Sequence, residues 1–238
     1  MKSLRLEAVA SLVKENCNVL DVGTDHAYLP IILSKTGKCQ SIIASDVSNN
    51  ALSYGEANLK KYHIANVKLV LSDGLKNIRD KYDTLTICGM GTYTIIDILK
   101  SGYLPKNIII SSNNDLYTLR CYLNSINYKI IKEIVIYENG KYYDIISYEK
   151  GQEKLSYYQK LYGKSNDKKY FKYLLHKETY IFKKSKNFKT LKNIIYGNVE
   201  STGVDTISKI CDGLGISLQE FFTSDLFGQE EKTNGYKD

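Results

Sequence analysis

The sequence has 238 residues, 43% of them hydrophobic, and a formal net charge of +7. This length allows one domain of ordinary size plus an appendage. The sequence contains no apolar run of about 18 residues and no basic-then-apolar leader, so we expect a cytoplasmic protein without membrane contact. Its five cysteines are scattered without a Cys-x-x-Cys pair, which indicates neither a disulfide framework nor a bound metal.

The elements predicted along the chain alternate between helix and strand. Apolar residues at helical spacing predict an amphipathic helix over residues 3–15. The apolar run 19–22 predicts the first strand, and Gly37 is expected to end the helix that follows it. Further strands are predicted at 41–45, 67–71, 83–88 and 107–111, and further helices at 29–34, 49–61 and 116–123.

The last two predicted strands, residues 128–137 and 141–148, form a hairpin around Asn139-Gly140. Strands that alternate with helices and then close with such a hairpin are typical of a parallel sheet whose last pair is antiparallel. The expected fold is therefore α/β, a doubly wound, Rossmann-like sheet of seven strands.

The chain is organised around the strand-to-helix turn from Asp21 to Pro30. A dinucleotide site requires Gly-x-Gly-x-x-Gly, but here only Gly23 is present, and Asp25 and Tyr28 replace the other two glycines. A carboxylate about 4 Å from a phosphate charge would cost on the order of 4 kcal/mol at an effective dielectric constant near 20. The sulfonium and ammonium groups of S-adenosylmethionine would instead be attracted. Asp21, Gly23 and Asp25 therefore predict a site for this cofactor, although Asp25 fits equally well as a cap of the following helix.

Two other acids follow predicted strands. Asp46, which Val47 follows, stands where doubly wound folds bind ribose hydroxyls; a helix cap is the alternative, and Ser48 is better placed for that role. Asp73, which precedes Gly74, could accept a hydrogen bond from an adenine amino group or form an Asx-turn.

Glycines also end the strand over residues 83–88. Gly89 and Gly91, on either side of Met90, would let a ligand approach the backbone closely. Cys88 is more typical of a small buried strand residue than of a nucleophile.

Residues 1 to about 150 resemble the bacterial tRNA (adenine-22-N1)-methyltransferases, which are class I S-adenosylmethionine-dependent enzymes. The matching motifs are Arg5 to Ala10, Asp21 to Pro30, Ser72 to Leu75, Asp83 to Gly91, Leu119-Arg120 and Glu138 to Lys141. The family often has Gln-Pro-Asn where this chain has Ser112-Asn113-Asn114. The resemblance implies a tRNA partner and a cofactor site made by Asp21, Gly23, Asp25, His26, Asp46, Val47, Asp73, Gly74, Gly89, Met90 and Gly91.

The resemblance also implies how substrate is held. Because N1 of adenine has its own lone pair, methyl transfer needs positioning but no covalent nucleophile. The adenine must leave its base pair, and we expect Tyr28 to stack on it and His26 to orient it, although His26 could instead be a buried structural residue. Arg5 is expected to meet a tRNA phosphate, and Asn113 and Arg120 are further candidates for tRNA contact.

Two segments follow the predicted methyltransferase domain (residues 1–150). Residues 151–197 carry a net charge of +9 and predict two amphipathic helices, similar in kind to the family's helical, coiled-coil-like C-terminal domain. They suit an RNA backbone, but a solvated helix face is the alternative. Residues 198–238 are acidic and resemble the closing helices of a Cro/CI-type helix-turn-helix domain without its reading helix, so we expect no DNA binding.

Three functions compete on this evidence: a monomeric tRNA methyltransferase, a small-molecule methyltransferase with the same cofactor residues, and a non-catalytic RNA-binding protein on the same fold. Replacement of Asp21 by alanine is expected to abolish cofactor binding and leave the fold intact.

Overall fold

The computed structural model describes residues 3–165, 167–174 and 217. The chain divides into two compact units, Met1–Ser165 and Asn166–Asp238. The first unit extends past the predicted boundary at residue 150. Most of the predicted segments 151–197 and 198–238 lie outside the described residues. No helix in the described part of the chain is long and apolar enough to cross a membrane.

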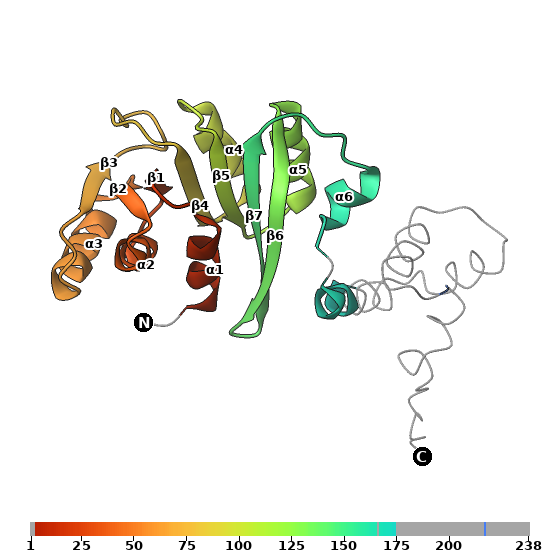
Figure 1. The fold of residues 1–238 in the computed structure, drawn as a ribbon, viewed down its shortest axis with the longest axis horizontal. Coiled ribbons are helices and arrows are strands. Elements are labelled where there is room, and N and C mark those ends of the chain that lie inside the picture. The colour runs from red at the N-terminus through yellow and green to blue at the C-terminus, as the bar shows by residue number, and fades with distance from the viewer. Residues whose placement is uncertain (1–2, 166, 175–216, 218–238) are drawn as a thin grey trace, which may run out of the picture. The chain divides into compact units, whose positions relative to one another are not determined.

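The first unit is built on one seven-stranded sheet with the order β3-β2-β1-β4-β5-β7-β6 (Figure 1). The strands are β1 (Cys17–Val22), β2 (Cys39–Asp46), β3 (Val67–Leu71), β4 (Thr84–Met90), β5 (Asn107–Ser112), β6 (Tyr128–Glu138) and β7 (Lys141–Lys150). The helices are α1 (Leu4–Leu12), α2 (Tyr28–Thr36), α3 (Asn49–Lys61), α4 (Thr92–Lys100), α5 (Leu116–Ser125) and α6 (Tyr157–Tyr162).

The strand pairing confirms the predicted fold. Strands β1 to β5 pair in parallel, and β7 is antiparallel to both β5 and β6. Gly37 ends α2 in the left-handed conformation, and the Ser48 hydroxyl caps α3, both as expected. Helix α4 was not predicted, because its Thr-Tyr-Thr-Ile-Ile run is rich in residues that favour strands.

Alternate residues of the central strands face opposite layers of helices. Leu20 and Val22 lie in one apolar cluster with residues of α4 and α5, whereas Val19 lies in a second cluster with residues of α1 and α2. The sheet therefore lies between two helical layers (Figure 1). Each fully buried leucine or valine contributes about 1.5–3 kcal/mol to folding, so this alternation fixes which helical layer each face of a strand packs against.

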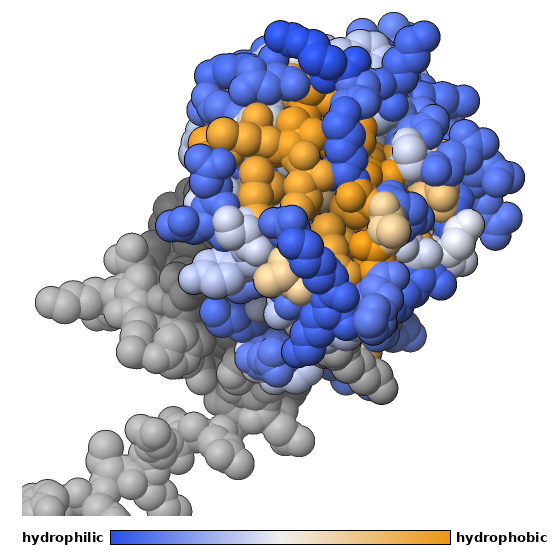
Figure 2. Space-filling model, turned by 90° about the vertical axis from the view of Figure 1, so that its left-hand side faces the viewer, coloured by the Kyte–Doolittle hydropathy of each residue, from blue (hydrophilic) through white to orange (hydrophobic). Residues whose placement is uncertain are grey.

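Strand β3 is one edge of the sheet. Figure 2 shows apolar side chains gathered on the side of the domain where α3 and β3 lie in Figure 1. Leu52, Val67 and Leu69 line a cavity of about 500 Å³ between these two elements. Lys68 Nζ lies 2.8 Å from Asp80 Oδ2 and so places charge on the edge strand, which discourages pairing with another strand.

Candidate active site

A cavity of about 790 Å³ lies at the carboxyl ends of the parallel strands. The chain passes from β1 to β2 on one side and later returns to β4 on the other, so β1 ends at the switch point where ligands bind in such sheets. The predicted residues that line the cavity are Arg5, Asp21, Gly23, Asp25, His26, Tyr28, Asp46, Val47, Asp73, Gly74, Gly89, Met90 and Asn113. The fold therefore brings together all the predicted site residues except Gly91 and Arg120.

Asp21 is the buried charge of the cavity. Asp21 is the last residue but one of β1 and is only 4% exposed, and the hydroxyl of Thr86 on β4 donates to its Oδ1 at 2.7 Å. Burial raises the pKa of this carboxyl to about 6; the hydrogen bond from Thr86 and the nearby Thr24 hydroxyl oppose the shift, and the charge of Asp46 adds to it. No lysine or arginine in the described part of the chain forms an ion pair with Asp21. The site therefore has an uncompensated acid that a cationic ligand would neutralise.

Asp46 ends β2 and is held by two backbone amides. Asp25 N donates to Oδ2 at 3.1 Å, and Ser48 N donates to Oδ1 at 3.0 Å. These bonds fix the direction of the carboxylate, whose remaining lone pairs are free for a diol. Asp25 does not cap α2, since Ala27 is the N-cap residue and has no side-chain cap, so that alternative is wrong.

Gly23 is required by its conformation. It has a φ of +72°, which residues with a side chain rarely adopt, and the end of the flexible Met90 side chain lies next to it. Gly91 does not line the cavity; it is the N-cap residue of α4. Its predicted contact with the cofactor is not supported by this position.

Asp73, one of the four acids that line the cavity, is exposed, and its Oδ2 lies 2.5 Å from Lys76 Nζ. Ser72 shapes the same turn through a hydroxyl bond to Gly74 O at 2.8 Å. Asp73 thus differs from Asp21, because solvent and a flexible lysine already compensate its charge.

Arg5 and Asn113 lie on the side of the cavity formed by β4 and β7. The Arg5 guanidinium lies 4.9 Å from the centre of the Tyr143 ring, a cation–π contact. Glu138 accepts from the backbone N–H of Leu4 at 2.6 Å and so fixes the start of α1. Asn113 Nδ2 donates to Gly89 O at 2.7 Å, which ties this residue to the end of β4.

Aromatic rings lie at the mouth of the cavity. The rings of His26 and Tyr28 are stacked with their centres 5.4 Å apart and an angle of 27° between their planes. The His26 side chain is 41% exposed, so it is not a buried structural histidine. Both rings are placed to meet a planar group beside the cavity.

Cys88 lines the same cavity but lacks the character of a nucleophile. Burial, the largest cause, raises the pKa of its thiol to about 12, and the charge of Asp21 adds to the shift. The thiol therefore stays protonated at neutral pH, in agreement with the expected role as a small strand residue.

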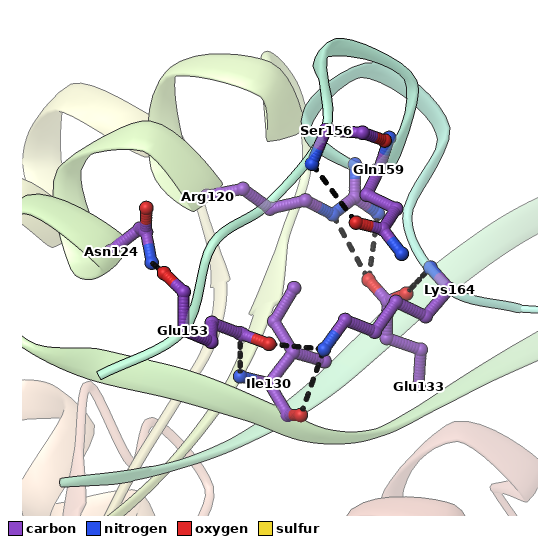
Figure 3. Close-up of polar contacts among 8 residues, drawn as sticks. All are labelled: Arg120, Asn124, Ile130, Glu133, Glu153, Ser156, Gln159 and Lys164. Carbon is purple, nitrogen blue, oxygen red and sulfur yellow. Dashed lines mark hydrogen bonds and ion pairs between the residues drawn. The ribbon is translucent and has the colours of Figure 1, made fainter. Parts of the chain in front are cut away.

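Arg120 does not line the cavity, and its predicted contact with tRNA is wrong. Its residue is 1% exposed, and its guanidinium forms an ion pair with Glu133, with Nη2 2.9 Å from Oε1 (Figure 3). Nη1 also donates to the carbonyls of Lys160 and Leu161. A buried guanidinium needs a counterion, and here it finds one inside the domain, so nothing remains for a substrate.

Lys164 extends this cluster. Its backbone N–H donates to Glu133 and its ammonium group pairs with Glu153, which in turn accepts from the backbone of Ile130 (Figure 3). Charges from α5, β6 and the segment after β7 thus hold one another in place.

Several lining residues were not predicted, among them Thr24, Ser72, Lys141 and Tyr143, and neither was Thr86, the hydrogen-bond partner of Asp21. Thr86 bonds to Asp21 because the two residues are partners in the register of β4 and β1. The sequence shows no sign of that pairing, since register is set by the packed sheet. Within the described residues no cluster of three or more His, Cys, Asp or Glu side chains suits a metal.

The parallel sheet with its antiparallel end, the glycine turn after β1 and the buried acid at the switch point define a Rossmann-like methyltransferase domain. A family model described as "Methyltransferase domain" matches residues 2–146. The tRNA (adenine(22)-N(1))-methyltransferase of Bacillus subtilis is 28% identical over 161 residues, which cover 65% of this chain and 68% of the relative.

Two solved structures of methyltransferases are similar to this chain. TrmK of M. capricolum, in complex with S-adenosyl-homocysteine, is 31% identical with a TM-score of 0.73 and covers 90% of this chain and 98% of its own. A putative tRNA (m1A22) methyltransferase of Streptococcus pneumoniae, in complex with S-adenosyl-L-methionine, is 32% identical with a TM-score of 0.71. The match covers 90% of this chain and 100% of the Streptococcus chain. The chain belongs to the tRNA (adenine-22-N1)-methyltransferase family.

Proposed function

We propose that this chain transfers the methyl group of S-adenosylmethionine to N1 of adenine 22 in tRNA. The observation that carries the proposal is the buried, uncompensated carboxylate of Asp21 beside a turn that is too acidic for a diphosphate. The relatives named above support the choice of cofactor and of substrate, because two of them bind the cofactor or its product and all are named for this tRNA position or for its enzyme.

Each cavity residue would contact a different part of the cofactor. Asp21 and Asp25 would face its cationic groups, Asp46 would accept hydrogen bonds from the ribose diol, and Asp73 would accept from the adenine amino group. The backbone at Gly23, Gly74 and Gly89 would approach it closely, next to Val47 and Met90. Asp21 is already held by Thr86 and Asp46 by two backbone amides, so these two carboxylates need little reorganisation on binding.

The chemistry requires positioning and little else. When bound, S-adenosylmethionine supplies the methyl group: its S–C bond breaks while the bond from adenine N1 to that carbon forms, which leaves S-adenosylhomocysteine and a cationic base. Tyr28 would stack on the adenine, and His26 would orient it. Holding the reacting atoms in line is worth several kcal/mol, and no general base is needed.

Arg5 Nη1 would lie 3.7 Å from a Cβ placed at Gly89, and we assign to this guanidinium an anionic partner. A tRNA phosphate is the expected one, and the carboxylate of the cofactor's methionine moiety is a second. Asn113, bonded to Gly89 O, would stand next to the adenine. The basic segment 151–197 would contact the RNA backbone, where each neutralised phosphate releases counterions.

The remaining assignments are also proposals. The protein would act as a monomer in the cytoplasm, it would not bind DNA, and the acidic segment 198–238 would serve as a packing hairpin.

A small-molecule methyltransferase would share the cofactor site, and a non-catalytic RNA-binding protein would share the basic segment. To separate these, bulk unmodified tRNA is incubated with the full chain and S-adenosylmethionine, and the modified nucleoside is mapped by mass spectrometry of ribonuclease fragments. Transfer of labelled methyl to metabolites and binding of S-adenosylmethionine and of tRNA are measured alongside. We expect 1-methyladenosine at position 22. Methyl label in metabolites but not in tRNA, or tRNA binding without cofactor binding, would reject the proposal.

A further inference from the structure

Three aromatic rings follow one another outward from the cavity. Tyr28 and His26 line it, and the His26 ring also contacts Tyr54 of α3, with ring centres 5.4 Å apart and an angle of 41° between the planes. Tyr54 is 59% exposed and does not line the cavity. The rings therefore continue from the place of methyl transfer to the open surface.

Helix α3 is built to hold this arrangement. Gly55 packs so closely against the turn after β1 that an added Cβ would lie 3.3 Å from Ala27 Cβ and 3.4 Å from Asp25 O. One turn later, Asn58 Nδ2 donates to His26 O at 3.0 Å. The backbone that carries His26 is therefore fixed to the helix that carries Tyr54, and the two rings are placed together by the fold.

The electrostatic surroundings favour a base over a phosphate. Asp25 Oδ2 lies 3.6 Å from His26 Nε2, so a carboxylate stands beside the rings and would repel the RNA backbone. Nucleobases are planar and uncharged, and every base can stack on an aromatic side chain whatever its identity.

We propose that His26 and Tyr54 form a second stacking site, which takes an unpaired nucleobase adjoining the adenine that enters the cavity. This inference rests on the proposed function. An adenine that leaves its helix exposes the face of its neighbour, and an aromatic surface outside the cavity would replace that lost stacking.

The test uses the full chain and a tRNA transcript in which one nucleotide next to adenine 22 is replaced by 2-aminopurine, whose fluorescence is quenched on stacking. We expect quenching with the wild type and with Tyr54→Phe, and little quenching with Tyr54→Ala. The KM for unmodified tRNA is expected to rise about 5- to 100-fold in Tyr54→Ala and to stay within about twofold in Tyr54→Phe, as for the loss of one base stack.

Tyr103→Ala is the matched control, because Tyr103 is 66% exposed but lies just before β5, at the amino ends of the parallel strands and away from the cavity at their carboxyl ends. It should leave KM unchanged. Equal quenching by wild type and Tyr54→Ala, or a rise in the Kd for S-adenosylmethionine as large as the rise in KM, would overturn the inference; the latter would show that Tyr54 only supports the turn. A wild type that does not methylate tRNA would reject the proposed function itself.

Discussion

Asp21 and the pair Arg120–Glu133 are both buried charged sites in one domain, but their roles differ. Arg120 and Glu133 compensate each other, and both side chains are almost fully buried. Asp21 is as deeply buried, but its partner is the hydroxyl of Thr86 and not a cation. A buried charge that is paired within the fold maintains the structure, whereas one without an opposite charge is prepared for a ligand. The predictions below test this difference, from the largest expected effect to the smallest.

Replacement of Arg120 by methionine should leave Glu133 buried and unpaired. We expect the free energy of unfolding to fall by about 3–5 kcal/mol, measured by urea denaturation of the full chain. The double variant Arg120→Met, Glu133→Leu should recover most of the loss, because both charges are then gone. The affinity of the folded single variant for S-adenosylmethionine should stay within about twofold of the wild-type affinity. A large drop in affinity with unchanged stability would show that Arg120 serves the ligand and not the fold.

Asp21→Asn should have the opposite effect, with a large loss of cofactor affinity and little loss of stability. It removes the charge that faces the cofactor, so the affinity for S-adenosylmethionine should fall roughly 100-fold or more in calorimetry. The fold should remain, because the amide needs no counterion. Asp73→Asn is the control, because Asp73 lies in the same cavity but is exposed. It should lower the affinity for S-adenosylmethionine much less than Asp21→Asn does. An unchanged affinity in Asp21→Asn would disprove the assignment of the site.

The hydroxyl of Thr86 stabilises the charged form of Asp21. Thr86→Val should therefore raise the pKa of Asp21 further and weaken cofactor binding roughly tenfold at pH 7, as expected for a hydrogen bond to a charged group. Part of the loss should return at pH 8.5. Thr84→Val, which removes a hydroxyl of the same strand that donates to Asp83 Oδ1, should not change the affinity.

The pH dependence of binding and of stability should run in opposite directions. Because the pKa of Asp21 is raised to about 6, the free carboxyl gains a proton as the pH falls, and affinity should drop about tenfold from pH 7 to pH 5. The unliganded fold binds this proton more tightly than the unfolded chain does, so Asp21 contributes more stability as the pH falls from 7 toward 4. In Asp21→Asn both dependences on this group should vanish. Parallel pH profiles for the two proteins would contradict this account.

The smallest effect is expected at the exposed pair Lys76–Asp73. Exposed ion pairs contribute little, so Lys76→Ala should change the free energy of unfolding by less than about 0.5 kcal/mol. Affinity for the cofactor should change by less than about threefold. A larger loss in either measurement would show that exposure is a poor guide to the importance of a charge in this cavity.

The sequence was sufficient for most of the fold. The alternation of apolar strands and amphipathic helices predicted the parallel sheet, and the Asn-Gly turn predicted its antiparallel end, because these signals are local. The turn from Asp21 to Pro30 likewise indicated the cofactor, since two acids in place of glycines change the sign of the charge that a ligand must carry.

What the tertiary structure alone decided was the partner of each charged group. Arg120 lies in a motif of the family and looked like a substrate contact, but Glu133, on the next strand, neutralises it inside the domain. Thr86 reaches Asp21, and Tyr54 reaches His26, across long intervals of sequence. The periodic pattern of apolar side chains along a strand or helix is a property of neighbouring residues, so the sequence shows it directly. The pairing of two distant groups depends on strand register and helix packing, which only the folded chain sets.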